Sequence, residues 1–300
     1  MNTENISDVT KRTIASPNRS FSDPNSGCLR ESLGNRFVYA VVSPRARGLS
    51  IGVNMNPDKF CNFDCGYCEV DRTATSSATS LDVAVMTDEL QRLLALAYSG
   101  DLHNFYHFRN TPPDLMKLRH VALSGDGEPT LCPNFLDALH AVIHLRALGQ
   151  FPFFKIVLLT NATGLDLREV QEGLKLFMPQ DEIWAKLEAG TQHHMEEVNS
   201  PNCLLDKVLE NILLVARQRP VIIQSLFPML DHEEPTVEEI EQYAERLSDL
   251  KRAGAQIPLV QIYSANRPMP HSKCSHLPLK TLARIAQRVR EVSGLKAEVF

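Results

Sequence analysis

Three cysteines lie close together in the chain, at Cys61, Cys65 and Cys68, soon after an apolar run that ends at Met55. Thiolates separated by three and then two residues on one loop can converge on a single small iron–sulfur cluster, and Gly66 relieves the backbone between them. A four-iron cluster normally has four thiolate ligands. Three cysteines would therefore leave one iron open to a substrate or cofactor.

A structural zinc site is the alternative for the same three residues. Such a site is closed and needs a fourth Cys or His ligand, and the local sequence has none, although Cys132 could reach the loop in space. Structural zinc sites usually contain paired Cys-x2-Cys knuckles, whereas this loop has a single one. The spacing therefore favours a cluster over zinc.

The composition of the whole chain is that of an ordinary globular protein. Its 300 residues are 43% hydrophobic, and 31 Lys and Arg against 36 Asp and Glu give a net charge of −5. No apolar run approaches the ~18 residues of a membrane span, and the polar start lacks the pattern of a signal peptide. We expect a cytoplasmic protein without membrane association. The mild acidity gives no global electrostatic reason to bind nucleic acid.

The elements that must position the cysteine loop follow a regular order. Six short apolar runs are each followed by a stretch with helical periodicity, which predicts parallel strands joined by right-handed crossovers in an open sheet or a partly closed barrel. The apolar pattern of residues 37–42 predicts an extra edge strand. The polar composition of residues 1–33 predicts a flexible arm, and the domain should follow it at residues 34–300. The predicted strands are 50–55, 120–125, 155–161, 182–189, 221–228 and 258–265, and the helices are 81–98, 134–148, 167–177, 204–218, 236–253 and 279–292.

The fourth predicted strand favours the barrel. A period of two places its apolar residues on one side, and helices must cover that side, so Lys186 and Glu188 should point into the lumen. Polar residues on the other strands also allow inward placement: Asn54, Ser124, Asn161, Gln224 and Gln261. Buried polar groups cost stability unless they are satisfied, and ligand binding is the usual reason to keep them. A hydrogen-bonded network without a ligand is the alternative.

The motif Cys-x3-Cys-x2-Cys, with Tyr67 just before its last cysteine, resembles the signature of the radical S-adenosylmethionine (SAM) superfamily. A second likeness lies at the end of the second predicted strand, where Ser124-Gly125-Asp126-Gly127-Glu128-Pro129 is similar to the Gly-Gly-Glu element of that family, with Asp126 inserted. The resemblance covers about residues 45–265. It implies an α/β fold, a partial (β/α)6 radical SAM barrel.

The resemblance also implies roles for particular residues. Cys61, Cys65 and Cys68 would ligate three irons of a [4Fe-4S] cluster, and the amino and carboxylate groups of SAM would chelate the fourth. The site residues that it implies for SAM are Gly125, Gly127 and Glu128 at the methionine moiety, Tyr67 at the adenine, Asn161 and Glu188 at the carboxylate and ribose, and Gln224 or Tyr263 on the adenine side. For the last four, ordinary hydrogen bonding at strand ends is an equal alternative.

Within the superfamily, the chain resembles the wyosine-type tRNA-modifying enzymes and their less characterised relatives most. The likeness is carried by residues 49–54, 124–131 and 181–189. Wyosine synthases use a second cluster held by upstream cysteines, whereas only Cys28 lies upstream here. The expected activity is that of an Fe-S oxidoreductase type of radical SAM enzyme: SAM is cleaved reductively to a 5′-deoxyadenosyl radical, which abstracts hydrogen from a substrate.

The expected partners are SAM, a one-electron reductant of flavodoxin or ferredoxin type, and an unidentified substrate. A small polar molecule is favoured slightly over tRNA. The alternatives are wyosine-type tRNA modification and a non-catalytic iron–sulfur or zinc-binding regulator. A basic stripe formed by Lys280, Arg284 and Arg288 could touch phosphates, but a solvated helix face explains it better. The pair His193-His194 predicts a solvated turn.

Overall fold

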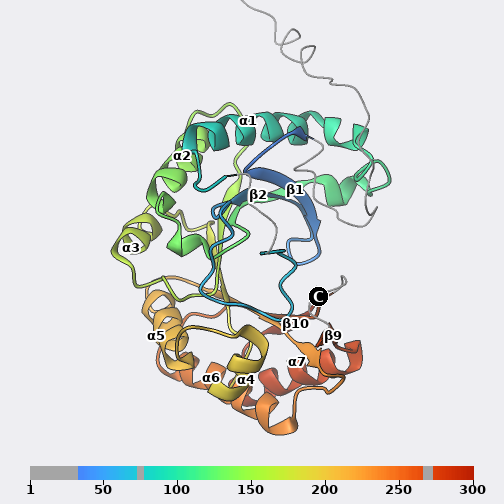
Figure 1. Cartoon of the computed structure of the whole chain (residues 1–300), viewed down its shortest axis with the longest axis vertical. Helices are drawn as coiled ribbons and strands as arrows, with labels where there is room; N and C mark the ends of the chain where they lie inside the picture. Colours follow the sequence, from blue (N-terminus) through green and yellow to red (C-terminus); the bar gives the residue numbers. More distant parts are fainter. Residues whose placement is uncertain (1–32, 73–77, 266–272) are drawn as a thin grey trace, which may run out of the picture.

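The structure is a computed structural model that describes residues 33–72, 78–265 and 273–300, so the arm expected over residues 1–33 lies almost wholly outside it. Its centre is a curled eight-stranded sheet in the order β1-β2-β3-β4-β5-β6-β8-β10 (Figure 1). From β2 to β10 every neighbouring pair is parallel, while β1 pairs with β2 antiparallel at one edge. The strands are β1 (Val38–Ser43), β2 (Gly48–Asn54), β3 (Leu118–Ser124), β4 (Lys155–Thr160), β5 (Glu182–Lys186), β6 (Ile222–Leu226), β8 (Val260–Tyr263) and β10 (Ala297–Val299).

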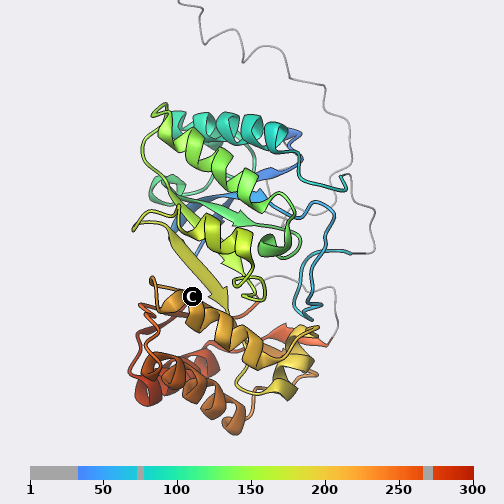
Figure 2. The same cartoon turned by 90° about the vertical axis from the view of Figure 1, so that its left-hand side faces the viewer.

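The helices pack around the outside of the curled sheet (Figures 1 and 2). They are α1 (Val83–Ser99), α2 (Phe135–Ala147), α3 (Arg168–Leu174), α4 (Gln192–Asn199), α5 (Leu205–Ala216), α6 (Val237–Arg252) and α7 (Leu279–Ser293). Six of them match the predicted helices within a few residues. No helix in the described parts of the chain has the length and apolar character needed to cross a membrane.

The partial barrel predicted from the sequence is confirmed. On β5, Ile183 and Ala185 belong to the main hydrophobic core beneath the helices, while Lys186 faces the opposite side and lines a cavity inside the barrel. The same alternation on the other strands leaves polar residues in the lumen, as expected for Ser124 and Gln224. The helical layer therefore takes the apolar face of each strand, and the lumen keeps the polar one.

Short elements were not expected from the sequence. The helix α4 occupies the place of the predicted turn at His193-His194, and that prediction is wrong because Thr191 caps the helix by accepting a 3.2 Å hydrogen bond from the His194 amide. The His194 side chain is buried. Two further strands, β7 (Pro228–Leu230) and β9 (Cys274–His276), form a small antiparallel sheet.

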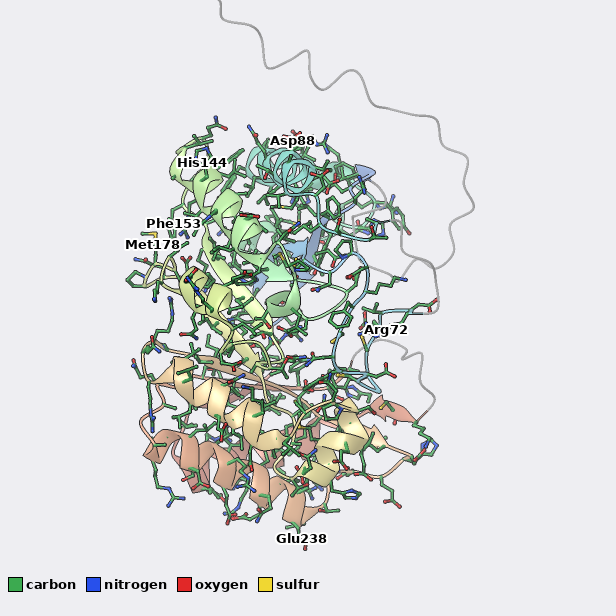
Figure 3. The ribbon with its side chains drawn as sticks, turned by 60° about the vertical axis from the view of Figure 1, so that its left-hand side comes forward. Arg72, Asp88, His144, Phe153, Met178 and Glu238 are labelled. Carbon is green, nitrogen blue, oxygen red and sulfur yellow. The ribbon has the colours of Figure 1, made fainter. Side chains whose placement is uncertain are left out.

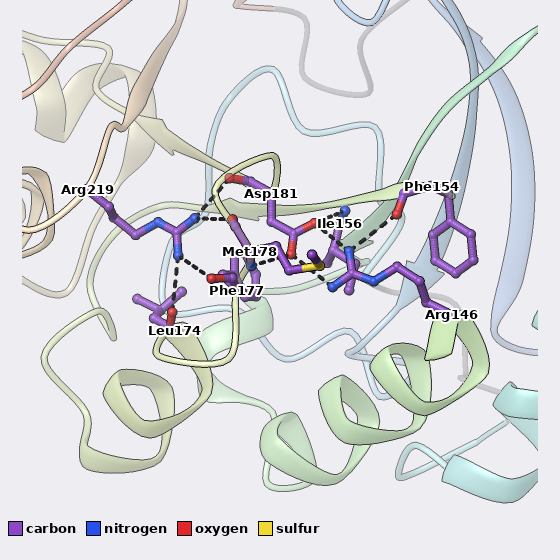
Figure 4. A network of polar contacts seen from close by, with 8 residues as sticks. All are labelled: Arg146, Phe154, Ile156, Leu174, Phe177, Met178, Asp181 and Arg219. Atoms are coloured by element: carbon purple, nitrogen blue, oxygen red, sulfur yellow. Dashed lines mark hydrogen bonds and ion pairs between the residues drawn. The ribbon is translucent and has the colours of Figure 1, made fainter. Parts of the chain in front are cut away.

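A buried ionic network fixes the amino ends of β4 and β5 (Figure 4). Asp181 pairs with Arg146 of α2 at 2.7 Å and accepts a hydrogen bond from the Ile156 amide, also at 2.7 Å. Arg219, after α5, donates to the carbonyl oxygens of Met178 and Asp181. Removing one partner of a buried pair leaves an uncompensated charge, so this network holds the two strands in register with their helices.

Candidate functional site

A cavity of about 610 Å³ opens among the carboxyl ends of the parallel strands. Residues from the ends of β3, β4, β5, β6 and β8 line it together with the loop that follows β2. Arg72 also lines the cavity. In Figure 3 it lies at mid-height, below the helices α1 and α2 and above the C-terminal helices. Most residues singled out in the sequence line this one cavity: Cys61, Cys65, Tyr67, Cys68, Gly125, Gly127, Glu128, Asn161, Glu188, Gln224 and Tyr263.

The cysteine loop is held by backbone contacts with the end of α4 and the residue that follows it. The amides of Asp64 and Gly66 donate to the carbonyl oxygens of Asn199 and Val198, at 3.0 and 2.9 Å. The Cys68 amide donates to the Cys65 carbonyl oxygen at 2.9 Å and closes a turn. The loop is therefore shaped by the protein itself, with all three cysteines on one wall of the cavity.

The donor set does not suit a single metal ion. In the described ranges, no group of three or more His, Cys, Asp or Glu side chains is close enough to hold one ion. Cys132, the residue considered as a fourth zinc ligand, is buried in the main core and is not part of the cavity wall. The zinc alternative therefore lacks its ligands within the described residues.

An iron–sulfur cluster fits the same wall better, because it spans thiolates that one ion cannot bridge. A donor is directed at each sulfur: the Phe63 amide at Cys61 Sγ (3.5 Å), Asn199 Nδ2 at Cys65 Sγ (3.3 Å) and Arg72 Nη2 at Cys68 Sγ (3.7 Å). Burial raises the pKa of the Cys65 thiol to about 11, so iron would have to displace its proton on binding.

The glycine-rich loop after β3 interlocks with the cysteine loop. A Cβ atom added at Gly127 would lie 1.7 Å from the carbonyl oxygen of Phe60, which also accepts a 3.2 Å hydrogen bond from the Glu128 amide. At Gly125 an added Cβ would lie 2.8 Å from Asn54 Oδ1. Both glycines are thus required by contact between two protein segments, in addition to any approach of a ligand.

Glu128 is buried with a largely satisfied carboxylate. Its Oε1 accepts hydrogen bonds from the amide and hydroxyl of Thr130 and from the Thr160 hydroxyl, and its Oε2 accepts one from the Asn161 amide at 2.7 Å. Burial raises the pKa of Glu128, although these donors oppose the shift. A carboxylate offers about four lone-pair directions, so Oε2 keeps capacity for one more donor.

A second polar cluster joins the cysteine loop to β5. Lys186 Nζ donates to the Tyr67 hydroxyl at 2.6 Å, and that hydroxyl donates to Glu188 Oε2. Asn199 Nδ2 donates to the same oxygen at 2.6 Å. Burial favours the neutral amine of Lys186, but the combined attraction of Glu188, Tyr263 and Cys65 outweighs burial and raises the pKa of the lysine. The Lys186 ammonium also lies 4.5 Å from the centre of the Tyr67 ring.

Asn161 lies between the two loops rather than in open space. Its Oδ1 accepts hydrogen bonds from Thr163, and its Nδ2 donates to Asn62 Oδ1 of the cysteine loop at 2.9 Å. On the other side of the lumen, Gln224 Nε2 donates to Gln261 Oε1 at 3.0 Å. These contacts correspond to the strand-end hydrogen bonding given above as the alternative to ligand contact.

Three residues near the cysteines were missed by sequence reasoning: Asn62, Arg72 and Asn199. Asn62 lies inside the motif and Arg72 follows it by four residues, and both could have been weighed for that reason. Asn199 has no signal in the sequence, because it reaches Cys65 only through the packing of α4 against the loop. Cys274 is also close, since a Cβ at Gly66 would lie 2.7 Å from its sulfur.

The comparisons with known proteins agree with this geometry. The model of the radical SAM superfamily matches residues 55–247. A UPF0026 protein of Methanocaldococcus jannaschii is 26% identical over 179 residues, which cover 59% of this chain and 49% of that protein. The chain thus spans about half the length of the curated relatives it matches.

Solved structures share the fold at low sequence identity. A radical SAM methyltransferase from Sphaerobacter thermophilus superposes with a TM-score of 0.61 at 15% identity, covering 88% of this chain and 68% of that one. TYW1 with a lysine-pyruvate adduct bound superposes with a TM-score of 0.53 at 13% identity, covering 87% and 85%. At these identities the likeness concerns the fold alone.

Proposed function

This chain belongs to the radical SAM superfamily, and we propose that it is an enzyme that cleaves SAM reductively and uses the 5′-deoxyadenosyl radical to abstract hydrogen from a substrate. The superfamily uses a [4Fe-4S] cluster and SAM, and these supply the electron transfer and the radical chemistry when bound. The observation that carries the proposal is the common cavity: three cysteines form one wall, and Glu128 and Glu188 lie at strand ends around it.

We assign the cluster to Cys61, Cys65 and Cys68. Each sulfur has an N–H donor directed at it, and such donors stabilise thiolate ligands. Phe60, next to Cys61, is 55% exposed, which leaves an apolar surface beside the cluster position for a reductant of flavodoxin or ferredoxin type.

We assign the amino group of SAM to Glu128. Its Oε2 has capacity for one more hydrogen bond, and a charge-assisted bond to an ammonium group would satisfy it. The glycines at 125 and 127 line the cavity beside it and bring the backbone close to the same space.

The ribose side is assigned to Glu188, with Tyr67 near the adenine. Glu188 Oε1 is buried and lies 3.2 Å from the Lys186 ammonium without a well-aligned hydrogen bond, so a ribose hydroxyl could donate to it. The Tyr67 ring packs with Val198 and Tyr263 in a small apolar cluster that excludes water from this side of the cavity. Asn161 would act by holding the cysteine loop through Asn62.

The substrate is proposed to be a small polar molecule rather than tRNA. The basic stripe on α7 is largely neutralised within the protein, because Arg284 pairs with Glu234 and Arg288 pairs with Glu241 and Glu291. A phosphate backbone would have to compete with those carboxylates. The polar lumen around Lys186, in contrast, is sized for a compact molecule. Wyosine-type modification of tRNA is the second candidate, favoured by the fold shared with TYW1.

Anaerobic reconstitution tests the proposal. It should give about four irons and four sulfides per chain, and reduction should give an EPR signal that shifts when SAM is added. Replacing Cys61, Cys65 or Cys68 by Ala should abolish the signal. Cys203→Ala is the matched control, since this cysteine does not line the cavity, and it should keep the signal.

A second arm measures SAM itself. Glu128→Gln should keep the cluster and weaken SAM binding by ~1.5–3 kcal/mol, the usual value of a charge-assisted hydrogen bond. Reduced enzyme with SAM should release 5′-deoxyadenosine when one host fraction is added, the small-molecule fraction rather than RNA. Zinc in place of iron would refute the cluster, and stimulation by RNA alone would favour tRNA as substrate.

A further inference from the structure

The hairpin between β1 and β2 crosses the open side of the barrel. Its turn is closed by a 2.9 Å hydrogen bond from the Arg47 amide to the Pro44 carbonyl oxygen. Arg47 then reaches the far edge of the sheet, where it pairs with Glu298 of β10 at 2.7 Å. The segment Val41 to Arg45 lines the cavity. The hairpin therefore forms a wall of the cavity that belongs neither to the cysteine loop nor to the loop after β3.

The two arginines of this hairpin differ in how their charges are balanced. Arg47 lies 5.7 Å from the centre of the Phe300 ring and has a carboxylate partner in Glu298. Arg45 lies 4.1 Å from the centre of the Tyr263 ring, inside the cavity, and forms no ion pair with any described carboxylate. Its Nε is shielded from solvent and has no hydrogen-bond partner among the described residues.

The other charged side chains described above have an ion-pair partner in the cavity wall or hydrogen bonds from the protein, although Arg72 Nε and Glu188 Oε1 are also buried without a hydrogen bond. Lys186 pairs with Glu188, and Glu128 accepts four hydrogen bonds from the protein. Arg72 lies near Asp64 and donates to backbone carbonyl oxygens. Arg45 is thus a cation whose Nε is buried and unsatisfied in a cavity, and such a group requires an explanation because an unpaired buried donor costs stability.

We propose that Arg45 binds an anionic group, a carboxylate or a phosphate, on the substrate of this enzyme. The planar guanidinium can donate two parallel hydrogen bonds to either group, and the Tyr263 ring fixes its plane from one side. Ser43 lines the cavity from the same hairpin, and its hydroxyl can donate a further hydrogen bond. This inference rests on the proposed function and adds the charge class of the substrate to it.

The binding of simple anions to the reconstituted enzyme with SAM bound tests the inference. The probes are inorganic phosphate and malonate, each measured by equilibrium dialysis against chloride of the same ionic strength. At least one probe should bind to the wild-type enzyme in competition with chloride. Binding of phosphate alone would indicate a phosphate group on the substrate, and binding of malonate alone would indicate a carboxylate.

Three variants of the same hairpin make the result specific. Arg45→Met should weaken binding of the probe at least tenfold. Arg45→Lys should lose less of the affinity, because lysine keeps the positive charge. Arg47→Met removes an arginine of the same turn that is balanced by Glu298, and it should bind the probe within twofold of the wild type. Thermal unfolding of each variant checks that the fold is retained.

The outcomes separate this inference from the proposed function. A wild-type enzyme without a cluster or without SAM binding would refute the proposed function. With both in place, the inference is wrong if neither probe binds, if Arg47→Met loses as much binding as Arg45→Met, or if Arg45→Met weakens SAM itself tenfold. The last result would make Arg45 a ligand of the SAM carboxylate instead.

Discussion

Asn199 contacts Cys65, one of the three cysteines that we propose as cluster ligands. Its amide donates to Cys65 Sγ at 3.3 Å and to Glu188 Oε2 at 2.6 Å, so it connects the cysteine loop with the end of β5. An N–H donor at a ligand sulfur offsets the negative charge that a cluster gains when it is reduced. The Asn199 donor should therefore make reduction of the proposed cluster easier.

Removing that donor should make the cluster harder to reduce. We expect Asn199→Ala to bind the cluster with a more negative midpoint potential than the wild type, because the reduced state loses a stabilising hydrogen bond. A redox titration followed by EPR measures the shift. Asn211→Ala is the control, since Asn211 is also a buried asparagine but donates to the carbonyl oxygens of Ala162 and Thr163. Equal potentials in all three proteins would contradict the role of Asn199.

The cysteine loop and the loop after β3 form one structural unit at the scale of elements. Phe60 precedes the first cysteine, and its carbonyl oxygen occupies the place where a side chain at Gly127 would start. The two loops come from neighbouring parallel strands, since β2 pairs with β3 from Leu49 to its end at Asn54. Their close contact requires glycine, because no other residue leaves room for the Phe60 backbone.

Gly127→Ala should therefore act on the cluster from a distance. The added methyl group would push the Phe60 carbonyl away and displace Cys61, so we expect reconstituted iron to fall well below the wild-type content while the chain stays folded. Iron and sulfide analysis measures the loss, and circular dichroism measures the fold. Gly173→Ala is the control, because its new Cβ would also be crowded, at 2.9 Å from Leu139 and 3.0 Å from the Phe135 ring, but by side chains of α2 and not by the backbone of the cysteine loop. Full iron content in Gly127→Ala would show that the two loops move independently.

The long elements could be predicted from the sequence, and the short ones could not. The six strand and helix units carry periods that persist over several turns or strand residues, so α6 was placed to within one residue at each end. The helix α4 has eight residues with a polar sequence, and β10 has three residues. Both are too short to show a detectable hydrophobic periodicity. Tertiary packing alone decides these segments.

The candidate site divides in the same way. The cysteine spacing and the Gly125 to Glu128 segment are local patterns, and the sequence places them directly. The partners of those residues are not local: Asn199 reaches Cys65 from 134 positions away, and Arg45 meets Tyr263 across the open edge of the sheet. Contacts of this kind depend on the curvature of the sheet, which strand patterns do not specify.

At the scale of the whole molecule, a second polar layer in the lumen lies on β2, β3 and β5. His120 Nε2 lies 2.8 Å from the Ser50 hydroxyl, and the ring meets the edge of Trp184 with 5.2 Å between centroids. Burial, aided by the positive charge of Lys155, lowers the pKa of His120 to about 3. Lys155 itself pairs with Glu182. Folding therefore favours the neutral imidazole in this layer.

A neutral buried imidazole makes the stability of the fold depend on pH. The unfolded chain protonates His120 below about pH 6.5, whereas the folded chain does so only near pH 3, so stability is complete at neutral pH and declines as the pH falls between these values. From pH 7.5 to 5.0 this residue alone should remove about 2 kcal/mol from the free energy of unfolding. Urea unfolding of the metal-free chain at the two pH values measures the decline.

His120→Gln isolates this contribution, because glutamine keeps a hydrogen-bonding group opposite Ser50 and does not titrate. Its free energy of unfolding should fall by about 2 kcal/mol less than that of the wild type over the same pH interval, even if the variant is less stable at pH 7.5. His144→Gln, at an exposed position on α2, should decline like the wild type. Parallel declines in the wild type and His120→Gln would mean that the lumen admits water and a proton to the imidazole, so that the lower layer of the barrel is open rather than sealed.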